Sequence, residues 1–161
     1  DKRGFFYEGY NKKLFDKKIK KINFVQDNYS FSKLKYTIRG LHYQKKPKSQ
    51  IKLIQVLRGK ILDIVVDINP KSKFYGTYKN YLLDSKNSQM LLIDDNFAHG
   101  FCTLEENTLV NYKVNNYYNK QKEETIIWND NYLNIKWPKA KTDYIISKKD
   151  LNGILFKKLK I

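Results

Sequence analysis

The chain has 161 residues and a formal net charge of +16 at pH 7. That length suits one domain with a buried core, so we expect residues 1–161 to form a single domain. No run of about 18 apolar residues occurs, so no transmembrane helix is expected, and no signal-peptide pattern opens the chain. The lone Cys102 excludes an internal disulfide framework and is typical of a cytoplasmic protein.

The positive charge first suggests a nucleic-acid partner. The excess is mostly lysine, however, and it is spread along the chain together with many Asn, Ile and Tyr residues, which A/T-rich codons encode. A nucleic-acid-binding protein would need a clustered basic patch on a recognisable module. We therefore expect no nucleic-acid partner and no membrane partner, and the positive potential would equally suit a phosphorylated small substrate.

In chain order the sequence consists mostly of short runs rich in Ile, Val, Tyr and Phe, separated by turn residues such as Gly59 and Pro70. These runs are typical of β-strands, which we expect at residues 21–26, 36–43, 52–57, 61–68, 79–83, 90–93, 100–104 and 108–114. Weaker strand candidates follow at 126–127 and 133–135. Helical periodicity is confined to short pieces near 11–20 and after Ser147. Such spacing predicts an all-β sandwich or barrel.

Alternation along four of these strands places a polar side chain on an otherwise apolar face. The four residues are His42, Lys52, Asp63 and Tyr112. For His42, strict alternation gives Ile38 and Gly40 as companions on the same face. Because an isolated buried charge is costly, one shared internal pocket explains the four groups better than four separate burials. The alternative, that some of these faces point to solvent, stays open.

These residue types suit proton transfer. Histidine titrates near neutral pH and can remove a proton, tyrosine can return a proton from the opposite side of a substrate, and lysine can stabilise a developing oxyanion. Together they indicate proton abstraction next to a carbonyl, with the carbanion held as an enolate. Each residue also has a purely structural interpretation, since a lone histidine often serves packing and the chain has 13 tyrosines.

A metal site of the common type needs three or four His, carboxylate or Cys ligands. The only histidines are His42 and His99, and the His-x-His-plus-Glu pattern of metal-binding barrels is absent. We therefore expect no metal and no cofactor, although a site of two histidines and one carboxylate stays open. The chain also lacks a Gly-rich loop that would cradle phosphate.

Several blocks of the sequence, in order and at matching spacing, resemble the dTDP-4-dehydrorhamnose 3,5-epimerase family. They are residues 3–8 (RGFFYE), 24–28 (FVQDN), 39–44 (RGLHYQ), 59–68 (GKILDIVVDI), 97–101 (FAHGF), 116–118 (NYY), 128–130 (WND) and 147–150 (SKKD). The resemblance implies a cupin-type jelly roll, a double-stranded β-helix barrel with short peripheral helices. It also implies a homodimer without metal. Family members carry further N-terminal strands before the first block, so we expect residues upstream of Asp1.

By this resemblance, the chain would epimerise C3 and C5 of a nucleotide-linked 4-keto-6-deoxy sugar. His42 looks like the family's base, and Asp150 looks like its partner. Tyr112 looks like the acid on the other face of the ring, and Lys52 resembles the group that stabilises the enolate. Positions that line the nucleotide-sugar pocket in the family are occupied by Arg3, Glu8, Gln26, Asn28, Arg39, Asp63, His99 and Tyr118.

The chain departs from the family pattern at Tyr29, where many members have histidine, and at residues 94–96, which replace a Pro-containing turn. These differences leave the substrate open. The alternatives are an epimerase that acts at one carbon only or on another nucleotide or sugar, a non-catalytic sugar-nucleotide-binding barrel, and a basic nucleic-acid-binding protein.

Overall fold

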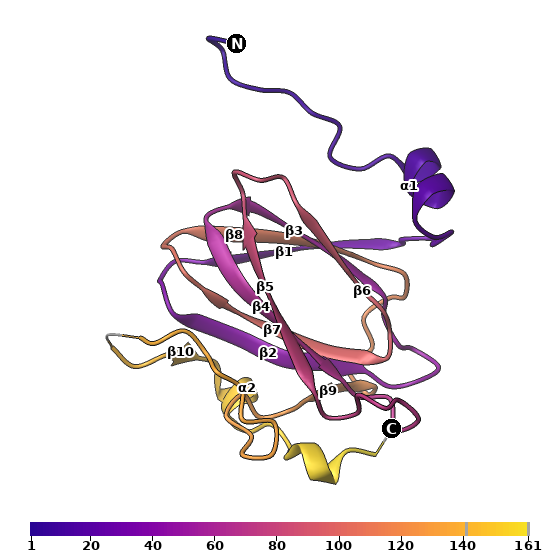
Figure 1. The fold of residues 1–161 in the computed structure, drawn as a ribbon, viewed down its shortest axis with the longest axis vertical. Coiled ribbons are helices and arrows are strands. Elements are labelled where there is room, and N and C mark those ends of the chain that lie inside the picture. Colours follow the sequence, from indigo (N-terminus) through magenta and orange to yellow (C-terminus); the bar gives the residue numbers. More distant parts are fainter. Residues whose placement is uncertain (141, 161) are drawn as a thin grey trace.

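Two largely antiparallel sheets packed face to face form the body of the protein in the computed structural model, which describes residues 1–140 and 142–160 (Figure 1). The smaller sheet has the order β1-β8-β3-β6, with β1 (Gln26–Ser32), β8 (Thr108–Val114), β3 (Lys52–Arg58) and β6 (Met90–Ile93). The larger sheet has the order β10-β2-β7-β4-β5, and β9 also pairs with β2. Its strands are β10 (Ile145–Ile146), β2 (Thr37–Gln44), β7 (Phe97–Thr103), β4 (Lys60–Asp67), β5 (Tyr78–Asp84) and β9 (Glu123–Thr125). The expected all-β, cupin-type jelly roll is confirmed.

The helices are short and lie outside the barrel, as expected. Helix α1 (Lys12–Lys18) begins after Asn11, whose side chain accepts a hydrogen bond from the amide of Leu14 and caps the helix. Helix α2 (Lys148–Leu151) and the 3₁₀ helix η1 (Phe156–Lys158) belong to the C-terminal segment. The residues before α1 form an arm outside the barrel (Figure 1), and the hydroxyl of Tyr7 in this arm accepts a hydrogen bond from Gln55 of β3 at 2.9 Å.

The strand predictions failed at the two ends of the chain. The expected strand at 21–26 does not form; β1 begins at Gln26 instead. Residues 133–135 lie in a turn and the following loop. The strand expected at 126–127 is also absent: β9 ends one residue earlier, at Thr125, and Ile126 forms only a single bridge to Ile154. Strand β10 was not expected. These elements lack apolar alternation and depend on backbone pairing with β8 and β2.

One hydrophobic core lies between the two sheets. Strand β3 contributes Ile54 and Val56, while β4 and β7 contribute Ile61 and Phe101 from the opposite sheet. Ile54 and Ile61 are fully buried, and each such side chain stabilises the fold by about 1.5–3 kcal/mol. This core fills one end of the barrel interior, so only the other end is free to hold polar groups.

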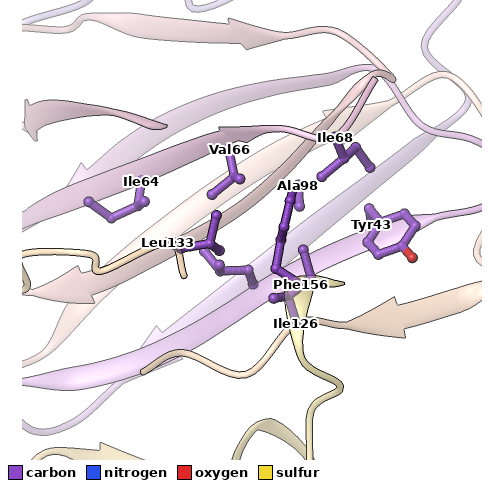
Figure 2. Close-up of a cluster of buried hydrophobic side chains, with 9 residues drawn as sticks. Tyr43, Ile64, Val66, Ile68, Ala98, Ile126, Leu133 and Phe156 are labelled. Carbon is purple, nitrogen blue, oxygen red and sulfur yellow. The ribbon is translucent and has the colours of Figure 1, made fainter. Parts of the chain in front are cut away.

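A second core covers the outer face of the larger sheet. Ile64 and Val66 of β4 lie against side chains of the C-terminal half of the chain, among them Ile126, Leu133 and Phe156 (Figure 2). The buried Asp130 carboxylate accepts a hydrogen bond from the Phe156 amide at 2.8 Å. These contacts anchor the segment that carries α2 to the barrel wall.

A bulge in β2 changes which residues face the barrel interior. Arg39 pairs with Phe101 and His42 pairs with His99, so three steps along β2 match two steps along β7. Residues 99 and 101 of β7 share one face. His42 therefore shares a face with Arg39, and the expectation that it shares one with Ile38 is wrong, because alternation is interrupted between them.

The bulge depends on two glycines. Gly40 has φ of +126°, and a Cβ there would lie 2.5 Å from the Cα of Gly100 on the neighbouring strand. A side chain at residue 40 would thus be excluded both by the backbone conformation and by the close approach of β7. The two strands can lie this close only because both positions are glycine.

No helix in the described part of the chain is long and apolar enough to cross a membrane.

Candidate active site

A cavity of about 270 Å³ lies at the polar end of the barrel interior. Both sheets contribute to it. The lining residues are Gln26, Asn28, His42, Tyr43, Gln44, Gln50, Lys52, His99, Tyr112, Tyr118 and Glu123. The structure thus brings together in one cavity the imidazole, phenol and ammonium groups on which the predicted chemistry depends.

The edge of β2 holds a histidine–carboxylate pair. His42 Nε2 lies 2.7 Å from Asp150 Oδ1, and the other carboxylate oxygen accepts a hydrogen bond from the Gly40 amide at 3.2 Å. Ser147 caps α2 by accepting from the Asp150 amide, which fixes the residue at the start of the helix. The hydrogen bonds reach Asp150 because the bulge turns the Gly40 amide toward it.

The charge state of Asp150 suits this pairing. Burial acts to raise the pKa of its carboxyl, but the hydrogen bond and charge of His42 and the hydrogen bond from Gly40 outweigh burial, so the pKa lies below the ordinary value. An ionised Asp150 orients the His42 ring and stabilises the imidazolium that forms when His42 takes up a proton.

Lys52 enters the cavity from β3 and is buried. Its Nζ donates to the carbonyl of His42 at 3.3 Å, and within the described residues that oxygen is its one hydrogen-bond acceptor. Burial lowers the pKa of Lys52 to about 8, although the charges of Asp63 and Glu123 oppose this shift. At neutral pH the ammonium is mostly protonated and has N–H groups left to donate to a ligand.

Tyr112 lies on β8 in the smaller sheet, whereas His42 lies on β2 in the larger one, and both line the cavity. Burial raises the pKa of the Tyr112 hydroxyl, as does the charge of Glu123. The hydroxyl therefore keeps its proton at neutral pH and can donate it. A base and an acid from opposite sheets can reach opposite faces of a ring placed between them.

Two further predicted residues form a buried pair. His99 Nδ1 lies 3.5 Å from Asp63 Oδ2, and both side chains are almost inaccessible to solvent. Burial raises the pKa of Asp63 well above its ordinary value, against the opposing charge of Lys52. Burial also lowers the pKa of His99 well below its ordinary value, as do the charges of Lys52 and His42.

The rim of the cavity is polar and internally bonded. Gln26 donates to Asn28 at 2.7 Å and accepts from the Tyr118 amide at 3.1 Å. The Tyr118 hydroxyl donates to Glu123 at 2.8 Å, and the ammonium of Lys149, which precedes Asp150, lies 2.6 Å from the same carboxylate. The rim is thereby tied to α2 and hence to the His42–Asp150 pair.

Five predicted residues do not line the cavity. Two of them, Asp63 and Asp150, are buried and lie against His99 and His42, which do line it. Arg39 donates to the hydroxyl of Ser32 and the carbonyl of Phe31, so its guanidinium ties β2 to the end of β1. Arg3 and Glu8 are exposed on the N-terminal arm, and Arg3 forms an ion pair with Asp1.

Sequence reasoning missed four lining residues: Tyr43, Gln44, Gln50 and Glu123. Gln44 could have been found, since it follows His42 by two positions on one strand and so shares its face. Its side chain bonds to the Lys48 carbonyl and the Asn119 amide, which shapes the cavity wall. Glu123 lies in a polar run with no strand pattern, so nothing in the sequence marked it.

Within residues 1–140 and 142–160, no three His, Cys, Asp or Glu side chains gather in a way that could hold a metal ion.

The fold and the cavity, whose lining comes from both sheets, define a cupin-type isomerase. The chain belongs to the dTDP-4-dehydrorhamnose 3,5-epimerase family, whose model matches residues 1–158.

Similar proteins are named as 3,5-epimerases of dTDP-linked sugars. The dTDP-4-dehydrorhamnose 3,5-epimerase of Shigella flexneri is 42% identical over 157 residues, which are 97% of this chain and 85% of that protein. The crystal structure of the Bacillus anthracis enzyme, with TDP and PPi bound, has a TM-score of 0.92 and 46% identity, covering 96% of this chain and 87% of that one. The crystal structure of dTDP-6-deoxy-D-glucose-3,5-epimerase from Legionella pneumophila, in complex with dTDP-4-keto-L-rhamnose, has a TM-score of 0.93 and 36% identity, covering 99% of this chain and 84% of that one.

Proposed function

We propose that this protein epimerises C3 and C5 of a nucleotide-linked 4-keto-6-deoxy sugar, converting dTDP-4-dehydro-6-deoxyglucose to dTDP-4-dehydrorhamnose. The observation that carries the proposal is the placement of His42 and Tyr112 on opposite sheets of one cavity that also contains Lys52. The family membership and the ligands named for the related structures support this substrate class.

The C4 ketone acidifies the hydrogens on C3 and C5. His42 removes one of them, and the electron pair of the broken C–H bond forms an enolate whose oxygen is stabilised by the Lys52 ammonium. Tyr112 then delivers a proton to the same carbon from the other face, which inverts it. Proton exchange with water restores neutral His42 and the Tyr112 hydroxyl before the second carbon reacts. No redox cofactor is required, because the ketone is already present.

The polar rim supplies groups for the rest of the substrate. Gln26, Asn28 and Tyr118 offer hydrogen-bonding side chains at the cavity mouth. Arginine suits a diphosphate because its planar fork donates to two oxygens at once. We assign this role to Arg3 from the arm and to Arg39, whose guanidinium would exchange its bonds to Ser32 and Phe31 for bonds to the diphosphate.

The arm leads to a proposal about assembly. Arg3 and Glu8 are exposed on this arm, and Phe5 and Phe6 are 87% and 98% exposed. Exposed apolar groups also lie on strands of the smaller sheet, among them Tyr29. A homodimer would bury these groups and place the arm of one copy over the cavity of the other. We also propose a cytoplasmic location, in keeping with the free, buried thiol of Cys102.

Deuterium labelling tests the reaction. The protein is incubated with dTDP-4-dehydro-6-deoxyglucose in deuterated water and the sugar is read by NMR. Deuterium at both C3 and C5, with inversion, is expected. Label at one carbon only would indicate a mono-epimerase, and tight binding of the nucleotide sugar without exchange would indicate a non-catalytic barrel. His42→Ala should abolish exchange at both carbons.

Subunit mixing tests the assembly. Arg3→Gln and His42→Ala variants are each expected to be inactive, and mixing them should restore roughly a quarter of the wild-type rate if arms cross between copies of a dimer. An arm that serves its own barrel would give no restoration, because each protomer would then carry one defect in its own site. Light scattering gives the mass of the assembly independently.

A further inference from the structure

Buried polar atoms without hydrogen-bond partners lie at and behind His99, which lines the cavity. In the described residues these include both carboxylate oxygens of Asp63 and the Nδ1 atom of His99. The two side chains approach to 3.5 Å. Buried polar atoms are nearly always paired, so their closeness indicates that a hydrogen bond joins the two side chains.

Two protonation states, which differ by one bound proton, could join these groups by a hydrogen bond. In the first, Asp63 is ionised and His99 carries its proton on Nδ1. In the second, Asp63 is protonated and donates to Nδ1, so that His99 carries its own proton on Nε2. The first state buries a carboxylate charge that accepts one hydrogen bond, and Lys52 is too far from it to form an ion pair, since no such pair within 4.0 Å occurs among the described residues. Burying a poorly compensated charge costs several kcal/mol.

The position of His99 Nδ1 indicates which ring nitrogen is left for the cavity. His99 lines the cavity, and its Nδ1 is turned to Asp63. Of the two ring nitrogens only Nδ1 is both buried and without a partner. Nε2 is therefore the atom that His99 offers to a ligand, and its protonation decides whether the ring donates a hydrogen bond or accepts one.

We propose that Asp63 keeps its proton, donates it to His99 Nδ1, and thereby makes His99 present an N–H donor to the cavity beside Lys52. Asp63 is then a positioning residue, and His99 is the group that contacts the ligand. Burial favours the neutral form of both residues, in agreement with this arrangement.

The arrangement has a use in the proposed reaction, and this part of the inference rests on the proposed function. A negative charge develops on a substrate oxygen when a proton leaves the neighbouring carbon. Fixed N–H donors in a buried site stabilise such an oxygen more strongly than water does. Lys52 supplies one donor and His99 Nε2–H supplies a second. His99 takes no proton from the substrate, because the lone pair on its other ring nitrogen, Nδ1, already accepts the hydrogen bond from Asp63.

The tautomer of His99 can be observed in the wild-type protein. The chain has only two histidines, so protein labelled with ¹⁵N-histidine gives two imidazole signals in a long-range ¹⁵N–¹H correlation, and His42→Gln identifies which belongs to His99. A neutral ring with the proton on Nε2 at pH 7 is expected. A proton on Nδ1, or on both nitrogens, would overturn the proposal. The readout needs no substrate, so it stands or fails separately from the proposed function.

Two substitutions of Asp63 test its role as donor. Asp63→Asn keeps an N–H donor toward Nδ1, and Asp63→Leu fills similar space without one. We expect Asp63→Asn to keep the Nε2–H form of His99. We expect Asp63→Leu to abolish the preference of His99 for the Nε2–H tautomer. It should also lower kcat by about 10²-fold, the usual effect of losing one oxyanion donor, with a smaller change in KM. Equal losses in kcat in both folded variants, with the His99 tautomer unchanged, would overturn the assignment.

Substitutions of His99 provide the matching test. Gln offers an amide N–H in place of Nε2–H, whereas Leu offers none, so His99→Gln should retain more activity than His99→Leu by about tenfold or more. Equal activity of the two variants would contradict a donor role. Absence of deuterium exchange in the wild-type protein would instead reject the proposed function and leave the tautomer result intact.

Discussion

His42 Nε2 lies 2.7 Å from Asp150 Oδ1, although 108 residues separate the two along the chain. The carboxylate reaches the histidine because the C-terminal segment runs beside the edge of β2. Strand β10 pairs in parallel with the start of β2, and β9 pairs with its end. Asp150 lies beside the part of β2 between these two pairings, where its carboxylate accepts a hydrogen bond from the Gly40 amide. The reactive ring is thus oriented by a residue on a different element.

Asp150→Asn is expected to leave the fold intact and to lower kcat by about 10²–10⁴-fold, because the amide cannot stabilise an imidazolium. Steady-state rates with the nucleotide sugar check this. Asp143→Asn, the same change at an exposed aspartate, is the matched control and should have the wild-type rate. A rate for Asp150→Asn within threefold of that control, roughly 0.6 kcal/mol, would show that His42 acts without its partner.

Tyr112→Phe removes the proposed acid and leaves the base in place. We expect loss of inverted product by about 10²-fold or more, while substrate protons still exchange with deuterated water because His42 can return what it removed. NMR of the recovered sugar distinguishes exchange with retention from exchange with inversion. Tyr132→Phe, at a tyrosine that is 52% exposed and does not line the cavity, is the control. Normal inversion in Tyr112→Phe would assign the acid to another residue.

Gly40→Ala tests the bulge that orients His42 and Asp150. A methyl group there would meet Gly100 Cα and the His99 carbonyl at 2.5 and 2.9 Å, at a φ of +126°. We expect the free energy of unfolding to fall by about 2 kcal/mol or more and the rate to fall with it. Gly9→Ala is the control, since a Cβ there has a single ordinary contact at 3.8 Å. Urea titration that gives equal stability for both variants would contradict the close approach.

The sequence was informative wherever one face of a strand is buried. Alternation correctly grouped Lys52 and Tyr112, because β3 and β8 keep an unbroken register across Ile54 and Tyr112. It failed in β2, where the bulge after Arg39 shifts the alternation by one residue. Only the opposing strand reveals that shift, since it depends on how closely Gly100 approaches.

Other features could not be predicted because they depend on distant backbone. Strand β1 has the polar sequence QDNYSFS, and it forms because its backbone pairs with β8 over seven residues. Glu123 reaches the cavity only because β9 pairs with the end of β2. The role of Asp150 came from the family resemblance, and no local pattern would have placed it beside His42.

The decline of kcat at alkaline pH should follow the loss of the proton from the Lys52 ammonium. Its pKa is lowered to about 8, so the ammonium that stabilises the enolate is lost as the pH rises through that value. We expect kcat to decline above pH 8 for this reason, and Lys52→Met to be slower by about 10²–10³-fold with no such decline. A pH profile of Lys52→Met that retains a decline near pH 8 would assign the titration to another group.

The same substitution should stabilise the fold. A lysine whose pKa falls from 10.5 to about 8 on folding weakens stability by roughly 3 kcal/mol at pH 7, because the unfolded chain holds the proton more tightly. This penalty is full below pH 8 and disappears as the pH rises toward 10.5, where the unfolded lysine also loses its proton. Lys52→Met should therefore unfold at higher urea concentration than the wild type at pH 7, with an advantage that shrinks between pH 8 and 10. Measurements at one protein concentration keep assembly effects constant. A stability advantage that grew with pH would show that folding does not lower the pKa of Lys52.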